Sequence, residues 1–261
     1  MSTEEKKQKI VLPTEKTPPT KVNPGTMILF GLQKCGKTTE LAKLDNCLLI
    51  DTEGGAEFVE VLKVTPPKGG PVTRMNWLKD IAKSIIDADR PYDYVAIDTF
   101  KQVDEWAEFS ATYKYMNSIT GQEFKRDKSG QMLNPDDPDY ETVHNIPNGY
   151  GYRLSRQEMI DIYELTKDLG RICTIYVCHV SDKSVVSKIS NQEVVTRDIS
   201  LTGKVKDIVG RRVDAIGYVY NQEGTTMISF KGNEEKIGGI RARHIVGYDG
   251  PLLWDRIFIK S

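Results

Sequence analysis

The feature that most constrains this chain is one stretch near its beginning, MILFGLQKCGKTTEL at residues 27–41. Its four apolar residues, 27–30, are long enough for a buried strand, and the residues from Thr38 onward favour the start of a helix. Two glycines, Gly31 and Gly36, frame the turn between them. A strand, the pattern G-x-x-x-x-G-K-[ST] and a helix together form a loop whose backbone N–H groups converge on an anion at the helix N-terminus. The sequence therefore predicts a phosphate-binding loop, called here the phosphate loop.

The expected ligand of the phosphate loop is a nucleoside triphosphate with Mg²⁺. Lys37 supplies a cation for the β- and γ-phosphates, and the hydroxyl of Thr38 supplies a ligand for Mg²⁺. The alternative is a glycine-rich turn with an ordinary surface lysine, but a chain of this length shows the pattern by chance in only about one case in a hundred. We therefore expect ATP and Mg²⁺ as cofactors. The residues expected to bind them are Gly31, Leu32, Gln33, Lys34, Cys35, Gly36, Lys37, Thr38 and Thr39.

The charge and cysteine content of the chain argue against several classes of protein. The 36 Lys and Arg residues nearly balance the 37 Asp and Glu residues, so any contact with nucleic acid or membrane must come from a local patch. The four cysteines show no C-x-x-C spacing, and three of them lie in or beside apolar runs, which is typical of reduced thiols. No signal peptide pattern and no apolar run approaching 18 residues is found. We expect a cytoplasmic protein that does not enter a membrane.

Strand and helix patterns alternate along the chain from residue 26 onward. This alternation predicts an α/β fold in which a mostly parallel central sheet is flanked by helices. Toward the end, two strand patterns flank a turn-rich spacer and predict a C-terminal β-hairpin. The expected strands are 47–51, 94–98, 172–180, 214–220 and 226–230, and the expected helices are 55–62, 75–88 and 154–169.

Composition predicts the organisation of the remaining segments. Residues 1–24 carry Lys, Glu and four prolines with few large apolar side chains, which is typical of a disordered arm. Residues 25–261 are expected to form a single domain. A polar insert at 117–148 and a polar loop at 181–203 interrupt it. Polar stretches of that length in a compact domain are usually functional or mobile, and we expect the second one to be mobile.

Two acidic residues follow apolar strands at the sheet edge where ligands bind. We expect Asp98 on the Mg²⁺ side of the nucleotide, with Thr99 orienting it; the alternative is an N-cap for the helix that begins near Phe100. Because residue 99 is not Glu, the base that many ATPases place directly after this aspartate is missing. Glu53, two residues past the strand 47–51, could take that role by polarising the attacking water, although the glycines beside it equally suit a plain strand-to-helix turn.

His179 closes the apolar strand ICTIYVCHV at the same edge. Its imidazole could sense the γ-phosphate through a hydrogen bond, and the alternative is a satisfied histidine that caps the strand. His144 and His244 are remote from it in sequence and complete no metal-ligand spacing. We predict no zinc site.

These motifs resemble those of the RecA-like ATPases, and most closely those of short phage-encoded RecA-like proteins implicated in single-strand annealing and recombination. The resemblance rests on five segments: GLQKCGKT at 31–38, LLIDTEGG at 48–55, YVAIDT at 94–99, the strand ending in His179, and LTGKVKDIVGRRVDAIGYV at 201–219. It implies a RecA-like P-loop fold and Mg-ATP hydrolysis coupled to single-stranded DNA in recombination, annealing or replication. It also implies a homo-oligomer that forms with nucleotide in the cytoplasm of a phage host.

The resemblance also implies roles for individual residues. Glu53 would be the catalytic base and Asp98 the acid on the Mg²⁺ side. Lys204 or Lys206 would be a finger that reaches the nucleotide of a neighbouring subunit, and the alternative for both lysines is a solvated helix face. The sequence departs from the family pattern in two ways, since it shows no counterpart of the appended domains of full-length recombinases and its insert at 117–148 matches no part of the pattern. These departures favour annealing or DNA loading over strand exchange.

Residues 181–206 are the segment expected to contact single-stranded DNA. Apolar and polar residues alternate there around a turn at Ser190 and Asn191, which predicts a hairpin. No aromatic residue lies in the stretch, so binding would depend on phosphate contacts and weaken steeply with salt. The alternative is an ordinary exposed hairpin. The cations are Lys183, Lys188, Arg197, Lys204 and Lys206, against the acids Asp182, Glu193 and Asp198.

Two other classes of function stay open. One is a P-loop nucleotide or small-molecule kinase, which needs an arginine-rich lid over the phosphates; Arg241 and Arg243 are the candidates for such a lid. The other is a nucleotide-dependent motor or switch whose partner is a protein.

Overall fold

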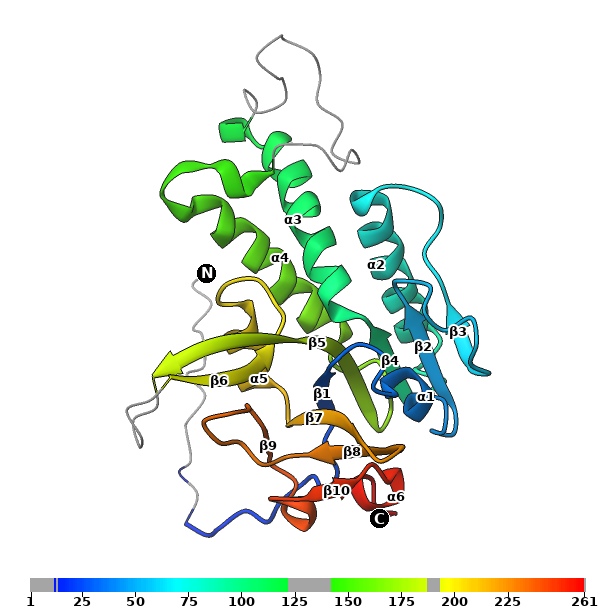
Figure 1. Ribbon diagram of the computed structural model, residues 1–261. Coiled ribbons are helices and arrows are strands. Elements are labelled where there is room, and N and C mark those ends of the chain that lie inside the picture. Colours follow the sequence, from blue (N-terminus) through cyan, green and yellow to red (C-terminus); the bar gives the residue numbers. More distant parts are fainter. Residues whose placement is uncertain (1–11, 13, 122–141, 187–192, 261) are drawn as a thin grey trace.

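One central sheet organises the computed structural model of this chain, which describes residues 12, 14–121, 142–186 and 193–260. Ten strands contribute to it: β1 Thr26–Gly31, β2 Cys47–Asp51, β3 Leu62–Val64, β4 Tyr94–Asp98, β5 Cys173–Val186, β6 Glu193–Ile199, β7 Ala215–Gln222, β8 Thr225–Ser229, β9 Gly239–Ile240 and β10 Asp249–Pro251. Eight of them follow each other in the spatial order β10-β8-β7-β1-β5-β4-β2-β3, and β6 and β9 pair with β5 and β7 (Figure 1).

The strands from β7 to β3 form a continuous parallel sheet. Antiparallel strands extend it at one edge, where β7 and β8 form a hairpin and β10 pairs with β8. The predicted α/β fold, with its mostly parallel sheet and C-terminal hairpin, is thereby confirmed. Because all parallel strands end at the same edge, their carboxyl ends bring together residues that are far apart in sequence.

Helices cover both faces of the sheet, which buries each parallel strand on both sides. Along β1, Ile28 and Phe30 pack with the face covered by α2 to α5, while Met27 and Leu29 pack with the face covered by α1, α6 and the C-terminal segment (Figure 1). The helix bounds are α1 Lys37–Leu41, α2 Pro71–Asp87, α3 Phe100–Met116, α4 Tyr150–Thr166, α5 Val205–Arg212 and α6 Trp254–Ile257. Short 3₁₀ turns lie at Val143–Asn145, Pro147–Gly149 and Arg243–Ile245.

The prediction of a helix at 55–62 is wrong. This segment forms turns and a bend before β3 begins at Leu62. The carboxylate of Asp51 accepts hydrogen bonds from the backbone N–H groups of Gly54, Gly55 and Ala56, at 2.8, 3.1 and 2.9 Å. A side chain that binds successive N–H groups in this way offers the backbone an alternative to a helix.

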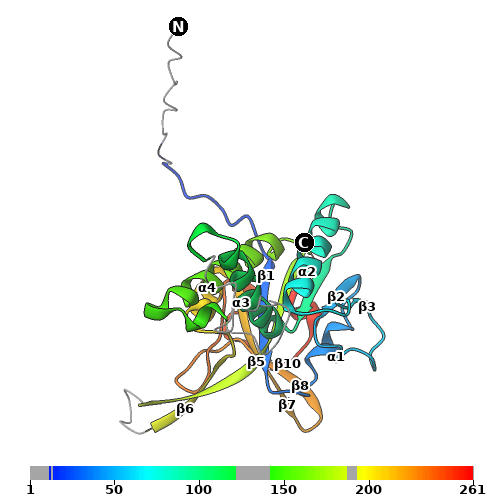
Figure 2. The ribbon, with the colours of Figure 1, turned by 90° about the horizontal axis from the view of Figure 1, so that it is seen from above.

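The hairpin expected in residues 181–206 is present, as β5 and β6 pair antiparallel from Val180 with Ile199 to Val186 with Glu193. The two strands form a ribbon that projects from the body of the molecule (Figure 2). The expected turn at Ser190 and Asn191 lies outside the described residues. So do residues 1–11 and 13 of the arm at 1–24 and residues 122–141 of the insert.

A buried carboxylate joins the three long helices. Glu158 of α4 is 3 % exposed, and its Oε1 accepts from Lys79 Nζ of α2 at 2.6 Å and from Ser110 Oγ of α3 at 2.8 Å. Lys114 of α3 donates to the other carboxylate oxygen. Burial alone would raise the pKa of Glu158, but the hydrogen bonds from Lys114 and Lys79 outweigh it and lower that pKa.

Replacing Glu158 with Gln should therefore lower the free energy of unfolding by about 2 kcal/mol at pH 7, the scale of hydrogen bonds to a charged group. Because the pKa of Glu158 is lowered by folding, its contribution is complete above its unfolded pKa of about 4.3 and is lost as the pH falls through the folded value. The difference between the two proteins should shrink below that pH. Urea unfolding at pH 7 and pH 4 measures it.

The matched control is Glu164→Gln in the same helix. Glu164 is paired with Lys167 and Arg212 but is half exposed, so its loss should cost less than about 0.5 kcal/mol. If both substitutions lower the free energy of unfolding equally, the contacts of Glu158 with Lys79, Ser110 and Lys114 do not stabilise the packing of α2, α3 and α4.

Candidate nucleotide site

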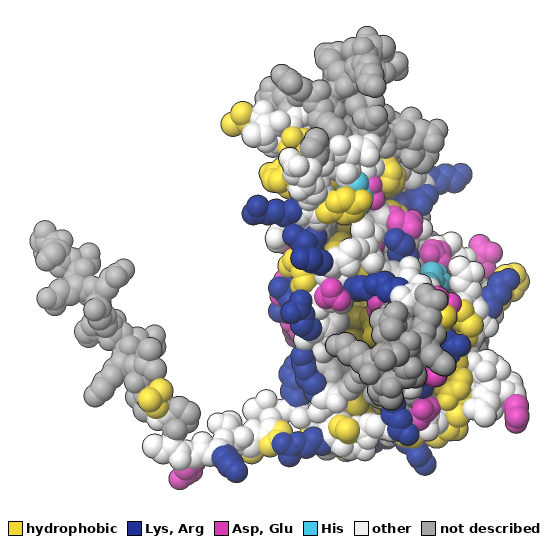
Figure 3. All heavy atoms as spheres, turned by 60° about the vertical axis from the view of Figure 1, so that its left-hand side comes forward, with side chains coloured by type: hydrophobic (Ala, Val, Ile, Leu, Met, Phe, Trp, Pro, Cys, Tyr) yellow, Lys and Arg dark blue, Asp and Glu magenta, His cyan; other side chains and the backbone are white. Residues whose placement is uncertain are grey.

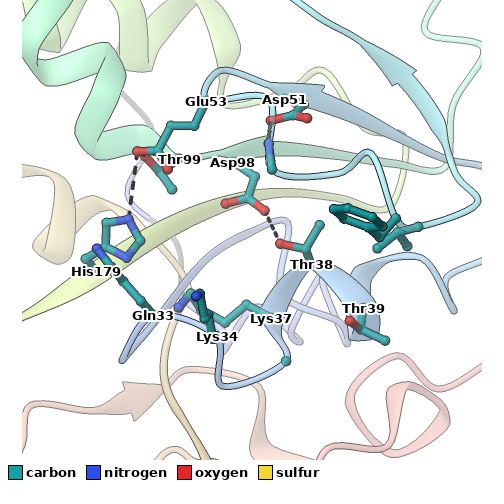
Figure 4. Close-up of a pocket in the computed structure, with 14 residues that line it drawn as sticks. Gln33, Lys34, Lys37, Thr38, Thr39, Asp51, Glu53, Asp98, Thr99 and His179 are labelled. Carbon is teal, nitrogen blue, oxygen red and sulfur yellow. Dashed lines mark hydrogen bonds and ion pairs between the residues drawn. The ribbon is translucent and has the colours of Figure 1, made fainter.

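A pocket of about 560 Å³ lies at the carboxyl edge of β1, β2, β4 and β5 (Figure 4). It is called here the nucleotide pocket. The phosphate loop and the start of α1 form one side, and the segments that follow β2, β4 and β5 form the other. The lining residues are Gln33, Lys34, Gly36, Lys37, Thr38, Thr39, Asp51, Glu53, Gly55, Phe58, Val59, Asp98, Thr99 and His179.

The glycines of the phosphate loop are required by the packing around them. A Cβ on Gly31 would lie 2.1 Å from the carbonyl oxygen of Val219 in β7. Gly36 has φ +101°, a left-handed conformation that favours glycine, and a Cβ there would lie 2.8 Å from Thr226 Oγ1 in β8. The loop is thus pressed against the β7–β8 hairpin, and larger residues would push it out of place.

Lys37 is buried in the loop that it is expected to serve. Its Nζ donates to the carbonyl oxygens of Gly31 and Leu32 at 3.1 and 2.7 Å. Cys35 is also buried, with its Sγ 3.6 Å from the Val219 oxygen. Gly31, Leu32 and Cys35 therefore shape the loop without lining the pocket, whereas the other six predicted binding residues line it.

Thr38 and Asp98 are brought into direct contact, although sixty residues separate them. Thr38 Oγ1 donates to Asp98 Oδ2 at 2.6 Å. Burial raises the pKa of Asp98, while the hydrogen bond from Thr38 and the charge of Lys37 oppose that rise. A hydroxyl and a carboxylate side by side at a phosphate loop are the oxygen donors that Mg²⁺ takes in such sites, so the residues present fit this ion.

Glu53, Thr99 and His179 form a second group across the pocket (Figure 4). Thr99 Oγ1 donates to Glu53 Oε1 at 2.7 Å, and His179 Nε2 lies 3.8 Å from the same oxygen. The Glu53 side chain is 41 % exposed, so water reaches it. The hydroxyl of Thr99 thus orients Glu53, where the sequence suggested Asp98, and it also caps α3 by accepting from the Gln102 N–H at 3.3 Å.

Asp51 ends β2 two residues before Glu53, and its carboxylate accepts hydrogen bonds from backbone N–H groups. Its three N–H partners hold the turn that carries Glu53, and Thr52 Oγ1 ties that turn to the Thr99 backbone, accepting from its N–H at 2.7 Å and donating to its oxygen at 3.0 Å. These contacts fix the backbone on both sides of Glu53.

Sequence reasoning missed two of the residues that line the pocket, Val59 and Phe58. Phe58 is the larger of the two. It is 98 % exposed and lines the pocket from the turn between β2 and β3. Its sequence signal is a single aromatic residue three positions after Gly55, in a segment that was expected to form a helix. An exposed aromatic ring beside a nucleotide pocket offers a flat apolar surface.

Lys204 and Lys206 do not line the nucleotide pocket of their own chain. Lys206 forms an ion pair with Asp198, whereas Lys204 is exposed at the start of α5. Of the proposed lid arginines, Arg241 is bonded to Asp214 and to the carbonyl oxygens of Arg211 and Arg212. Among the described residues that line the pocket, the only cations of the Lys and Arg type are Lys34 and Lys37.

Known proteins resemble this chain in sequence and in structure. A family model described as an AAA domain matches residues 23–242, a range that contains the phosphate loop, Glu53, Asp98 and His179. The RadB recombinase is a similar solved structure, with 13 % sequence identity, a TM-score of 0.37, and coverage of 83 % of this chain and 86 % of that chain. A comparison with curated proteins finds no match. No helix in the described ranges is both long and apolar enough to cross a bilayer.

Proposed function

Because this chain belongs to the AAA domain family, we propose that it binds ATP with Mg²⁺ and hydrolyses it in the nucleotide pocket, as an ATPase that acts on single-stranded DNA. The observation that carries this proposal is the 2.6 Å hydrogen bond from Thr38 to Asp98 beside the buried Lys37. It joins the phosphate loop to the acid of a neighbouring strand, in the arrangement that a phosphate-bound metal requires.

Six side chains of the pocket have a part in this reaction. Lys37 neutralises phosphate charge, and Thr38 with Asp98 would hold Mg²⁺, which supplies charge stabilisation on the transferred phosphoryl group. Glu53 polarises the attacking water. Thr99 holds the carboxylate of Glu53 in place. The proposed role of His179, whose Nε2 lies 3.8 Å from Glu53 Oε1, is to sense the γ-phosphate through a hydrogen bond.

A neighbouring subunit would complete the site. The cations of the Lys and Arg type among the described residues that line the pocket are Lys34 and Lys37, and a neighbouring subunit would add a further cation to stabilise the transition state. We propose Lys204 for this role in a nucleotide-dependent homo-oligomer, because Lys204 is exposed whereas Lys206 is held by Asp198.

The ribbon formed by β5 and β6 is the proposed contact with single-stranded DNA. It continues directly from His179, so its position is linked to the nucleotide pocket. Its charge is partly compensated, since Asp198 Oδ2 lies 3.3 Å from Lys183 Nζ and also binds Lys206. Arg197 lies over the ring of Tyr218, 5.5 Å from its centre. Asp198 thus sets how much positive charge the ribbon presents.

Replacing Asp198 with Asn should strengthen DNA binding, because it releases Lys183 and Lys206 to phosphates. Each added phosphate contact steepens the dependence of log affinity on log salt by about 0.7 for a single strand, so two added contacts should increase the magnitude of the slope by about 1.4. Conversely, Lys183→Ala with Arg197→Ala should make the slope shallower by about the same amount. Fluorescence anisotropy with a labelled oligonucleotide across a salt series measures both.

The control is Asp182→Asn, which makes the same charge change on the same ribbon at a residue that has no ion pair among the described contacts. It should change the slope less than Asp198→Asn. Slopes identical to wild type in all variants, with DNA still bound, would place the DNA path elsewhere and leave the ATPase proposal intact.

The same assay separates the remaining classes of function. A kinase, or a motor with a protein partner, predicts no salt-dependent retention on single-stranded DNA with or without ATP. The proposed ATPase predicts retention that nucleotide alters.

A further inference from the structure

A second, smaller hollow lies between α3, α4 and the first turn of α5, outside the nucleotide pocket. Its volume of about 30 Å³ has room for one or two waters, or for one or two oxygens of a phosphate group whose other atoms stay outside, but not for a nucleotide. We call it the phosphate hollow. The side chains that line it and carry N–H or O–H groups are His144, Arg156 and Lys204, with the hydroxyls of Tyr152, Ser155 and Thr202.

Two of these cations have no side-chain partner among the residues that the structure describes. Neither Arg156 nor Lys204 makes a side-chain hydrogen bond or ion pair with any residue that the structure describes, whereas nearby Lys206 and Arg212 are paired with Asp198 and Glu164. Figure 3 shows Lys and Arg side chains gathered on this face of the molecule. In a chain whose charges nearly cancel, two unpaired cations at one hollow leave a local excess of positive charge.

The rest of the hollow is held rigidly. His144 Nε2 is 2.7 Å from Ser155 Oγ, and its Nδ1 is 3.0 Å from Glu108 Oε1. The ring of Tyr152 stacks on that of His144, with 4.1 Å between centres and 12° between planes. Preorganised groups lose little conformational entropy when they bind a ligand.

The carboxylate that lines the hollow does not cancel the positive charge of Arg156 and Lys204. Asp104 is buried, and its Oδ2 accepts from the Thr202 N–H at 2.8 Å and lies 3.5 Å from Lys101 Nζ. This carboxylate is thus satisfied by its own partners, and Arg156 and Lys204 remain available. The first turn of α5 adds the favourable end of a helix dipole for an anion.

We propose that the phosphate hollow is a second oxyanion site of this protein, which binds one phosphate group through Arg156 and Lys204. The phosphate can come from a nucleic-acid backbone that continues from the β5–β6 ribbon, or from free inorganic phosphate. Only the first source rests on the proposed function. The loop that forms the hollow is also bonded to the strand of the nucleotide pocket, since the Ser200 N–H donates to the His179 oxygen at 3.0 Å.

The first test uses inorganic phosphate as the probe, with the full chain and with the nucleotide pocket filled by a non-hydrolysable ATP analogue. Calorimetry at low salt should show that Arg156→Gln weakens phosphate binding about tenfold, on the scale of one charged hydrogen bond. Arg156→Lys should recover part of the affinity, which a purely structural role of the arginine would not allow. The control is Lys83→Gln, an exposed lysine of α2 without an ion pair among the described contacts, which should change nothing.

The second test identifies the source of the phosphate. If it is the nucleic-acid backbone, Arg156→Gln should make the salt slope for an oligonucleotide shallower by about 0.7, and equally so for an abasic oligonucleotide. Loss of inorganic phosphate binding with an unchanged slope would assign the site to free phosphate. Loss of phosphate binding in a protein that binds no DNA at all would support the hollow and contradict the proposed DNA function. If Arg156→Gln matches Lys83→Gln in both assays, the proposal is overturned.

Discussion

Lys37→Ala should bind Mg-ATP about 10- to 100-fold more weakly than the wild-type protein, on the scale of one or two charge-assisted hydrogen bonds. Lys37 is the only buried lysine that lines the described part of the pocket, and its Nζ lies within the curve of the phosphate loop. Without it, the β- and γ-phosphates meet only the partial charge of the helix N-terminus. Isothermal calorimetry with and without Mg²⁺ measures the loss.

The control for this variant is Lys43→Ala, which removes the same charge shortly after α1. Lys43 is exposed, is paired with the buried Glu40 and does not line the pocket, so its removal should leave the affinity unchanged. A thermal unfolding curve shows whether Lys37→Ala remains folded. If a folded Lys37→Ala protein binds Mg-ATP within about twofold of wild type, the assignment of the nucleotide site to the phosphate loop is wrong.

Glu53→Gln should bind ATP normally and turn it over at least tenfold more slowly, which is the lower end of losses on removing a general base. Gln keeps the size of Glu and can still accept the hydrogen bond from Thr99 at 2.7 Å, so the pocket is preserved. A base acts on the attacking water in the transition state and contributes little to binding of the ground state. Steady-state turnover and a separate affinity measurement distinguish the two effects.

Glu57→Gln is the matched control, since Glu57 is exposed in the same turn and does not line the pocket. It should hydrolyse ATP at the wild-type rate. If Glu53→Gln also does so, the base lies elsewhere. Asp98 would then be the next candidate, because the carboxylate of Asp51 is already occupied by three backbone N–H groups.

Short-range patterns were enough to predict most of the secondary structure. The strand at 94–98 matches β4, and the strand at 47–51 matches β2. Both succeed because a strand buried on both faces by helices needs a continuous run of apolar residues. The expected helix at 55–62 fails because Asp51, several residues earlier, binds the N–H groups that a helix would have begun with. Such a contact leaves no mark on the periodicity of the segment itself.

The sequence likewise predicted some features of the candidate site and not others. The phosphate loop can be recognised in the sequence because one continuous segment must provide glycines, a lysine and a hydroxyl in a set order. The acids Glu53 and Asp98 could be placed at the correct edge because Asp98 ends an apolar strand and Glu53 follows one by two residues. Their partners could not be inferred, since the bond from Thr99 to Glu53 depends on the lateral order of β2 and β4 in the sheet.

Local sequence thus decides which segments become strands or helices, because burial imposes a period on side chains close together in the chain. Tertiary structure decides what those segments meet. The contact of Thr38 with Asp98, the pairing of Lys206 with Asp198 and the grouping of Arg156 with Lys204 all join residues from different elements. Whether a lysine is paired or free depends on where the neighbouring element places its carboxylate. That placement is set by the order and packing of the whole sheet and its helices.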